Sequence, residues 1–498
     1  MAAPMSMGLG ALADVVGPER VIGIPVGEIS ALAYDSRRVG PGTLFFAVPG
    51  VHVDGHDFVP DAVAAGATAV VVERELPQLS VPQLVVTNSR FALADAADAW
   101  FGRPSEQLTV IGVTGTDGKS TVTALAAEML WGSRRHPGQI GTVQIGIFDD
   151  IVPNDERNTT PEALELQELL ARMVAAGNDS VVMEATSHAL ALGRTRNCRF
   201  DVGVITTVTS EHLEFHGTVE AYRAAKARLI EEAPTAVLNA DDASFDYFRA
   251  RAADRVITYA IDGEADLRAG NLRPDPSGTS FHLEAPSWHG EVRIGIPGRF
   301  NVANALAALG VVEALGLDVH HASMALATTS GVPGRMERID AGQPFTVIVD
   351  YAHTADSLEK MLATLRPLTR GRLVVVFGSA GERDPTKRPA MGRVAAELAD
   401  LVVVTDEDPR LEDPHLINEA IAAGARATGA VDGENLVVID DRREAITHAL
   451  GTARDGDVVL LAGKGHETSI FYGTEKLPWD DRQVAREALA DLGWTDER

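Results

Sequence analysis

Short apolar runs that end in polar clusters recur along this chain of 498 residues, and they constrain its fold more than any other feature. From Leu108 onward the runs read VIGVTGTDGKS, SVVMEATSH, DVGVITTVTSEH and TAVLNADD, and helix-like segments lie between them. This alternation predicts a largely parallel sheet, because parallel neighbours need long, usually helical, crossover connections. Ligands of such sheets bind beyond the carboxyl ends of the strands, where the polar clusters fall.

The same pattern starts again after GVPGRMERI, residues 331–339, with FTVIVDYAHT, RLVVVFGSAGERD, LVVVTDEDPR, LVVID and VVLLAGKGHE. Before Leu108, residues 22–103 carry shorter strand-like and helix-like segments. A strand-like, turn-rich excursion is expected at about 262–296. We therefore predict an α/β protein with a small N-terminal α/β domain over 1–105, a central parallel-sheet domain over 106–335 and a C-terminal Rossmann-like domain over 336–498.

The stretch VIGVTGTDGKSTVTAL, residues 110–125, has the order of a strand, a glycine-containing loop and a helix. Gly115 and Gly118 allow phosphates to approach the backbone closely, and Lys119 supplies a cation. A hydroxyl for Mg²⁺ follows at the start of the helix. The stretch therefore predicts a nucleotide site, and with it a central domain that is P-loop ATPase-like.

Charge and cysteine content exclude several classes of protein. The formal net charge of −27 opposes association with nucleic acid or with an anionic membrane, so any phosphate site must be local. The single cysteine, Cys198, rules out a disulfide framework, suits a reducing compartment and is expected to be a packing residue. No apolar run reaches the roughly 20 residues of a membrane span. We expect a cytoplasmic protein that neither binds nucleic acid nor inserts into a membrane.

Two strand ends of the central domain carry candidate metal ligands. Glu184 follows the apolar run SVVM of SVVMEATSH, and His212 ends DVGVITTVTSEH, so both are positioned to reach a metal near the phosphate loop. For each residue a role as a helix cap or a satisfied hydrogen-bonding group is equally open. Lys226 lies in the helix-like segment EAYRAAKARLI, where spacing alone predicts a solvated surface lysine.

The strand ends of the C-terminal domain are rich in charge. Arg383 and Arg410 can each bind a carboxylate in bidentate fashion, and Glu467 can receive an ammonium group. An amino acid carries both charges, so this row of strand ends predicts an amino-acid site. A surface network of ion pairs is the alternative.

A series of ordered blocks resembles the Mur ligase family, most closely its MurE type, which adds a diamino acid to UDP-N-acetylmuramoyl-L-alanyl-D-glutamate. The blocks are YDSRRVGPGTLFFAVPG, VTGTDGKST, NTTPEALELQ, MEATSHALALGR, HLEFHGTVEAYRAAKARL, PGRFNVANALAA, VPGRMERI, VDYAHTADSLEKML, GSAGERDPTKRPAMG, DEDPRLEDP and AGKGHE. The resemblance implies a monomeric, ATP- and Mg²⁺-dependent ligase of peptidoglycan precursor synthesis. Its three domains would hold the uridine nucleotide, ATP and the amino acid. ATP would phosphorylate the terminal D-Glu carboxylate, and the amine would then displace phosphate.

The resemblance also assigns roles to individual residues. ATP would be held by Gly115, Thr116, Asp117, Gly118, Lys119, Ser120 and Thr121, with Asn301, Asn304, Arg335, Asp350 and His353 around the nucleotide. The metal ligands would be Ser120, Glu184, His212 and Lys226. Lys226 matches a lysine that the family carbamylates, which reverses the surface assignment, and Lys119, Lys226, His212 and Glu184 would be catalytic.

Substrate roles follow in the same way. Ser36 would contact the uridine nucleotide, and the muramoyl dipeptide would be held by Asn158, Thr159, Thr160, Thr186 and Arg194. The incoming amino acid would meet Arg383, Glu407, Asp408, Pro409, Arg410, Gly463 and Glu467.

Two other functions stay open at this stage. A folylpolyglutamate synthase shares the ATP loop and the modified lysine, but it lacks the N-terminal uridine domain that DSRRVGPGTLFFAVPG indicates. A non-catalytic paralogue would keep the fold, although the intact Lys119, Glu184, His212 and Lys226 argue against it.

The identity of the amino acid is also open. Enzymes of this type that use meso-diaminopimelate usually carry DNPR, where this chain reads Glu407, Asp408, Pro409 and Arg410. A carboxylate at Asp408 would repel a distal carboxylate and would slightly favour lysine or ornithine, whose side chains end in an ammonium group. Arg410 and Arg383 keep diaminopimelate possible.

Overall fold

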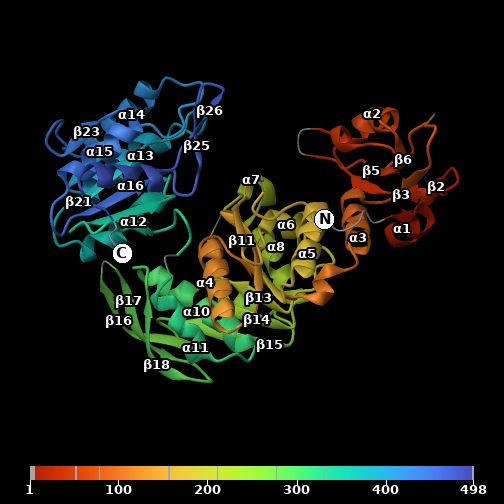
Figure 1. The fold of residues 1–498 in the computed structure, drawn as a ribbon, viewed down its shortest axis with the longest axis horizontal. Helices are drawn as coiled ribbons and strands as arrows, with labels where there is room; N and C mark the ends of the chain where they lie inside the picture. Colours follow the sequence, from red (N-terminus) through yellow and green to blue (C-terminus); the bar gives the residue numbers. More distant parts are fainter. Residues whose placement is uncertain are drawn as a thin grey trace. The chain divides into compact units, whose positions relative to one another are not determined.

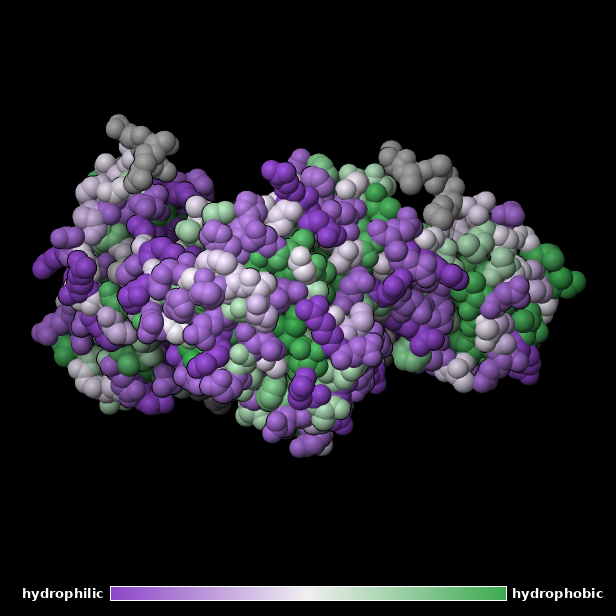
Figure 2. All heavy atoms as spheres, turned by 90° about the horizontal axis from the view of Figure 1, so that it is seen from below, coloured by the Kyte–Doolittle hydropathy of each residue, from purple (hydrophilic) through white to green (hydrophobic). Residues whose placement is uncertain are grey.

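The computed structural model describes residues 6–50, 53–77, 79–154, 158–209, 211–275, 277–329 and 331–495. Its chain divides into two compact units. The first comprises Met1–Arg268 and Leu306–Ala322, and the second comprises Ala269–Ala305 and Ser323–Arg498. None of the helices in the described residues has the length and apolar character that crossing a membrane requires. Hydrophilic residues cover most of the face that Figure 2 shows, in keeping with the high net charge.

The N-terminal part is a small α/β domain built on a five-stranded sheet. The strand order is β2 (Arg20–Ile22), β7 (Gln83–Val85), β6 (Ala67–Val72), β5 (Thr43–Phe46) and β4 (Ala31–Ala33). Helices α1 (Leu9–Val16) and α3 (Ser89–Trp100) bury their apolar residues with Leu44 and Phe46, and α2 (Val59–Ala64) packs with Phe45. Strand β5 is buried on both faces, as expected for a strand inside a parallel sheet. A two-stranded sheet of β1 (Met7–Gly8) and β3 (Glu28–Ile29) accompanies it.

The central sheet has eleven strands and confirms the predicted βα alternation. Seven neighbouring strands of the sheet, from β9 (Pro137–Ile140) through β8 (Thr109–Thr114) to β16 (Leu267–Asp275), run parallel, whereas β10 (Gln144–Ile147) is antiparallel to β9. The order is β11 (Asp150–Pro153), β10 (Gln144–Ile147), β9 (Pro137–Ile140), β12 (Ser180–Glu184), β8 (Thr109–Thr114), β13 (Val202–Ile205), β14 (Thr235–Asn239), β15 (Arg255–Ala260), β16 (Leu267–Asp275), β17 (Gly278–Glu284) and β18 (His289–Ile294). The excursion at 262–296 is therefore a continuation of this sheet.

The helices that accompany the central sheet follow its strands in the chain (Figure 1). Apolar residues of α5 and α8 are buried with those of β8 and β12, because these strands carry side chains that are apolar on both faces. The helices are α4 (Lys119–Gly132), α5 (Ala163–Ala176), α6 (Ser187–Leu192), α7 (Leu213–His216), α8 (Val219–Glu232), α9 (Phe245–Arg249), α10 (Arg299–Ala314) and α11 (Val319–Ser323).

The C-terminal domain, teal to blue in Figure 1, is a six-stranded sheet between two layers of helices. The strand order is β19 (Glu337–Ile339), β20 (Thr346–Asp350), β24 (Val458–Ala462), β21 (Leu373–Phe377), β22 (Leu401–Val404) and β23 (Leu436–Val438), and only β19 is antiparallel to its neighbour. One face packs on α12 (Ala355–Leu365), α13 (Lys387–Leu398) and α14 (Pro414–Arg426). The other packs on α15 (Arg442–Thr452) and α16 (Asp481–Asp491). A hairpin of β25 (Ser469–Tyr472) and β26 (Glu475–Pro478) follows β24.

A fully buried ion pair braces the strand ends of this domain. The side chains of Arg442 and Asp481 are 0% exposed, and two hydrogen bonds of 2.8 and 2.6 Å join them. The remaining donors of Arg442 reach the carbonyl oxygens of Asp406, at 3.1 Å, and of Ala462, at 2.8 Å. One guanidinium therefore connects the carboxyl ends of β22 and β24.

Removal of the charge from Asp481 is expected to destabilise this domain strongly. Asp481→Asn leaves the buried Arg442 guanidinium without its counter-charge, which costs about 3–5 kcal/mol. The matched control is Glu487→Gln, which breaks the exposed pair with Arg443 and should cost less than about 1 kcal/mol. Hydrogen exchange of peptides covering β22 and β24 measures both losses. Equal exchange in the two variants would contradict the bracing role.

Candidate functional site

Strand β8 runs between β12 and β13 in the central sheet, and its loop is the predicted phosphate site. In the register of these strands, Glu184 lies beside Val113 and Ile205 lies beside Thr114. The three strands run in the same direction, so Glu184 and the loop that begins at Gly115 emerge at one edge of the sheet. Parallel α/β sheets bind ligands at this edge.

The loop after β8 is shaped by its glycines and held by β13. A Cβ added to Gly115 would lie 1.8 Å from Oγ1 of Thr206, so only glycine fits there. Gly118 has φ +87° directly before the first residue of α4, Lys119. The Thr206 hydroxyl donates to the carbonyl of Asp117 at 2.6 Å. The loop thus presents backbone N–H groups at a helix N-terminus, which is the arrangement that binds phosphates.

Two lysine side chains converge on the same carbonyl oxygen of this loop. Nζ of Lys119 donates to the carbonyls of Gly115, at 3.1 Å, and Thr116, at 2.8 Å. Nζ of Lys226 donates to the Gly115 carbonyl at 2.7 Å and lies 4.5 Å from the centre of the Tyr222 ring. The surface position that spacing predicts for Lys226 is therefore wrong, because the residue is only 1% exposed.

Burial changes the chemistry of Lys226. The pKa of its amine is lowered well below the ordinary value, first by burial and then by the nearby charge of Lys119. A neutral amine carries a lone pair and can act as a nucleophile, which an ammonium group cannot.

Glu184 is hydrogen-bonded to threonines. Its carboxylate is 1% exposed, and it accepts hydrogen bonds from the backbone N–H of Thr142, at 2.8 Å, and from the Thr142 hydroxyl, at 3.1 Å. The Thr142 hydroxyl lies 3.0 Å from that of Thr159. The Thr160 hydroxyl donates to the Glu184 carbonyl at 2.8 Å and accepts from the Thr186 N–H at 3.1 Å. The predicted metal ligand and three predicted dipeptide contacts therefore form one network.

Arg194 joins this network through the Thr160 carbonyl and also forms an ion pair that the sequence did not indicate. It donates to the Thr160 carbonyl at 3.1 Å and pairs with Glu162 at 2.8 Å. Glu162 also pairs, at 2.7 Å, with Arg90 of helix α3 in the N-terminal domain. Glu162 directly precedes helix α5, where an acidic residue is ordinarily explained by its favourable interaction with the helix dipole. Its ion pairs with two arginines therefore could not be recognised from the sequence.

The remaining residues predicted for the first unit lie in separate places. Ser36 begins a 3₁₀ turn in the N-terminal domain and is half-buried. Asn158 is half-buried directly before Thr159, and its carbonyl accepts from Asn154 at 3.4 Å. Ser120 and Thr121 occupy the first turn of α4.

His212 has φ +55° at the start of α7, and its side chain is about half exposed. Its ring centre lies 4.7 Å from that of His188, and Nδ1 lies 3.4 Å from a Glu214 oxygen. Within the part of the chain that the structure describes, no group of three or more His, Cys, Asp and Glu side chains is arranged to hold a metal ion.

In the second unit, three of the predicted nucleotide residues surround Tyr351. The Arg335 guanidinium lies 4.7 Å from the centre of the Tyr351 ring, and Nδ1 of His353 lies 2.8 Å from the Tyr351 carbonyl. Asp350 accepts from the N–H groups of Met336 and Ala352, both at 2.8 Å. Burial raises the pKa of Asp350 and lowers that of His353.

The other two nucleotide residues lie in α10. Asn304 donates to the side-chain oxygen of Asn301 at 3.3 Å, and Asn301 donates to the Pro297 carbonyl at 2.8 Å. Both are buried.

The predicted amino-acid residues other than Arg383 gather at the carboxyl ends of β22 and β24. Glu407, Asp408 and Pro409 are buried, and burial raises the pKa of Glu407 to about 7. A Cβ added to Gly463 would lie 3.1 Å from Oε2 of Glu407, so the two strand ends meet closely. Arg410 has φ +53° and donates its backbone N–H to the Phe471 carbonyl at 3.0 Å. Arg383 is exposed in the loop after β21.

Lys464 links two of these carboxylates, and the sequence analysis missed it. Its Nζ, on a side chain that is 0% exposed, donates to Oδ1 of Asp408 at 3.0 Å and to Oε2 of Glu467. The Phe471 N–H also donates to Oδ1 of Asp408 at 3.0 Å. Asp408, which was expected to repel a distal carboxylate, is therefore already paired with a cation. The only available signal was a lysine between the glycines of AGKGHE.

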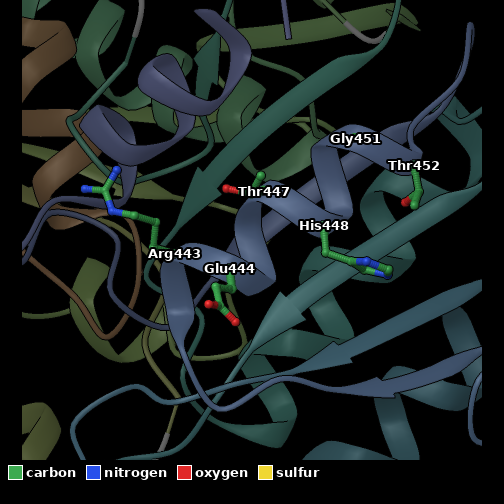
Figure 3. A pocket seen from close by; sticks show the side chains of 6 residues that line it. All are labelled: Arg443, Glu444, Thr447, His448, Gly451 and Thr452. Atoms are coloured by element: carbon green, nitrogen blue, oxygen red, sulfur yellow. The ribbon is translucent and has the colours of Figure 1, made fainter. Parts of the chain in front are cut away.

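A surface hollow elsewhere in the C-terminal domain lacks the predicted site residues. Figure 3 shows that its lining comes from one helix, α15, through Arg443, Glu444, Thr447, His448, Gly451 and Thr452. None of the predicted site residues belongs to it, so it is not a candidate for the chemistry.

Comparison with known proteins matches three family models to the chain: "Mur ligase family, catalytic domain" over residues 28–100, "Mur ligase middle domain" over 113–312 and "Mur ligase, glutamate ligase domain" over 334–465. A UDP-N-acetylmuramyl-tripeptide synthetase of Roseiflexus sp. (strain RS-1) is 48% identical over 487 residues, covering 94% of this chain and 96% of that protein. A UDP-N-acetylmuramoyl-L-alanyl-D-glutamate--2,6-diaminopimelate ligase of Geobacillus kaustophilus (strain HTA426) is 45% identical over 475 residues, with the same coverage.

The fold is also similar to a solved structure. It is that of a UDP-N-acetylmuramoyl-L-alanyl-D-glutamate--2,6-diaminopimelate ligase, with a TM-score of 0.73 and 31% identity. The match covers 99% of this chain and 100% of that chain.

Proposed function

Because this chain belongs to the Mur ligase family, we propose that it is a MurE-type ligase, which uses ATP to join a diamino acid to UDP-N-acetylmuramoyl-L-alanyl-D-glutamate in peptidoglycan precursor synthesis. The strongest support for this proposal is the 45% identity to a diaminopimelate ligase over 94% of the chain. The folylpolyglutamate synthase and the non-catalytic paralogue are not favoured, since relatives of this one type match nearly the whole chain. The cytoplasmic location and the monomeric state stay predictions.

The reaction needs positioning and charge neutralisation rather than a protein nucleophile. The terminal D-Glu carboxylate attacks the γ-phosphorus of ATP, and ADP leaves, which gives an acyl phosphate. The neutral amine of the diamino acid then attacks the acyl carbon, a proton leaves the nitrogen, and inorganic phosphate departs from the tetrahedral intermediate. Lys119 would leave the loop carbonyls to meet the β- and γ-phosphates.

The donor set near the loop fits Mg²⁺ in part. Magnesium prefers oxygen ligands and is usually held by one or two carboxylates together with substrate phosphates and water. Glu184 and Ser120 offer such oxygens, His212 offers a nitrogen, and Lys226 would offer an oxygen only as a carbamate. When bound, Mg²⁺ would neutralise charge on the transferring phosphoryl group. The network of threonines around Glu184 would keep its carboxylate in place.

At the C-terminal strand ends, the amino acid would be held by opposite charges. Arg410 and Arg383 would bind carboxylate, and Glu407 and Glu467 would receive ammonium. Asp408 already accepts from Lys464 and from the Phe471 N–H, which offsets much of its charge. We therefore propose meso-diaminopimelate as the amino acid that is added.

A competition between amino acids tests this assignment. We expect kcat/KM for meso-diaminopimelate to exceed that for L-lysine and L-ornithine at least tenfold, or about 1.4 kcal/mol. The variant Asp408→Asn should keep this preference within about threefold, because Lys464 already offsets the charge of Asp408 and keeps a second carboxylate partner, Glu467, in the variant. A preference for lysine or ornithine that disappears in Asp408→Asn would show that Asp408 selects the side chain.

A further inference from the structure

Thr142 contacts both oxygens of the Glu184 carboxylate. Its backbone N–H donates to Oε1 at 2.8 Å and its hydroxyl donates to Oε2 at 3.1 Å. It stands in the connection between β9 and β10, where a Cβ added to Gly141 would lie 2.6 Å from Oε1. The connection between β9 and β10 thus contacts both oxygens of the Glu184 carboxylate.

The direction of the hydrogen bonds in this network follows from the number of protons. A carboxylate only accepts, so the one proton of the Thr142 hydroxyl points to Glu184. The contact of 3.0 Å between Thr142 and Thr159 must then be donated by Thr159. With its own proton used, the Thr159 oxygen offers only lone pairs to a ligand. Its partner in a bound substrate must therefore be a donor, such as a peptide N–H.

We propose that Thr142 is a positioning residue that orders this chain of hydrogen bonds for both substrates. Through Glu184 it fixes a carboxylate that would bind Mg²⁺, and through Thr159 it presents an acceptor to a peptide N–H of the muramoyl dipeptide. The Thr160 hydroxyl donates to the Glu184 carbonyl at 2.8 Å. The segment that carries Thr159 and Thr160 is therefore joined to Glu184 by this second hydrogen bond, in addition to the contact between Thr159 and Thr142. This inference rests on the proposed function, and it adds how the metal ligand and the dipeptide segment are held in one geometry.

Two substitutions at this position separate the hydroxyl from the shape of the side chain. Thr142→Val removes the hydroxyl and keeps both the branched shape and the backbone N–H, whereas Thr142→Ser restores the hydroxyl. We expect Thr142→Val to weaken Mn²⁺ binding, measured by electron paramagnetic resonance with a non-hydrolysable ATP analogue, about tenfold or more. Thr142→Ser should stay close to the wild type. Unchanged circular dichroism would show that the fold is retained.

The proposed contact between Thr159 and a peptide N–H of the dipeptide is tested by calorimetry of dipeptide binding without metal or ATP. Two analogues of the UDP-muramoyl dipeptide are used, each methylated at one peptide nitrogen. We expect the wild type and Thr142→Ser to bind one analogue about tenfold more weakly than the parent, and Thr142→Val to lose this discrimination. Equal Mn²⁺ affinity in Thr142→Val and wild type, or equal discrimination, would overturn the inference. If the wild type does not bind the parent dipeptide, the proposed function itself is overturned.

Discussion

Replacement of Lys119 by alanine is expected to lower ATP turnover on the order of a thousandfold, as does the loss of a group that neutralises developing charge in phosphoryl transfer. Lys119 is the first residue of α4, and its ammonium group donates hydrogen bonds to the carbonyls of Gly115 and Thr116. From this position its cation can reach phosphates bound at the helix N-terminus. The fold should be retained, because the bonds of this side chain to the described residues are with carbonyls of the loop.

Phosphate release in the presence of the muramoyl dipeptide and the amino acid measures this effect. The control is Lys476→Ala, which removes an exposed lysine from β26 and should leave the rate unchanged. Near-normal phosphate release by Lys119→Ala would refute the assignment of the ATP loop.

The second large effect is expected at Lys226. Its buried amine, with a pKa lowered by burial and by Lys119, is suited to react with CO₂. In that reaction the nitrogen forms a bond to carbon and loses one proton, which yields a carbamate anion. Lys226→Ala removes this anion, so we expect loss of activity on the order of a thousandfold, as for Lys119→Ala. Formate or acetate should restore part of the activity by supplying a carboxylate.

The carbamate that we propose at Lys226 should depend on pH. Because the pKa of the Lys226 amine is lowered, the neutral form persists to a lower pH than for an exposed lysine. The carbamate should therefore be lost as pH falls, when the amine takes up a proton. Intact mass measured under conditions that preserve CO₂ detects it. An unmodified and fully active enzyme would contradict the assignment, and added carboxylates should not affect Lys476→Ala.

Much of the fold and part of the site were predictable from the sequence, because they depend on order along the chain. The strand pattern around VIGVTGTDGKS and VVLLAGKGHE predicted parallel sheets with polar carboxyl ends, since buried parallel strands are continuous apolar runs. Gly115, Gly118 and Lys119 were recognisable because a phosphate loop requires them in sequence. Their positions in the structure agree with that expectation.

By itself, the sequence determined a three-domain α/β ligase of the Mur family and the strand ends where its chemistry would lie. Only the tertiary structure decided the state of the charged groups there. Lys226 bonds to a carbonyl 111 positions away, and Asp408 pairs with a lysine 56 positions away. Neither contact follows from a period of 2 or 3.6 residues, which reports only the face on which a side chain lies. The charge, pKa and free lone pairs of a side chain depend on the neighbours that folding brings to it, so they are fixed only when the chain is packed.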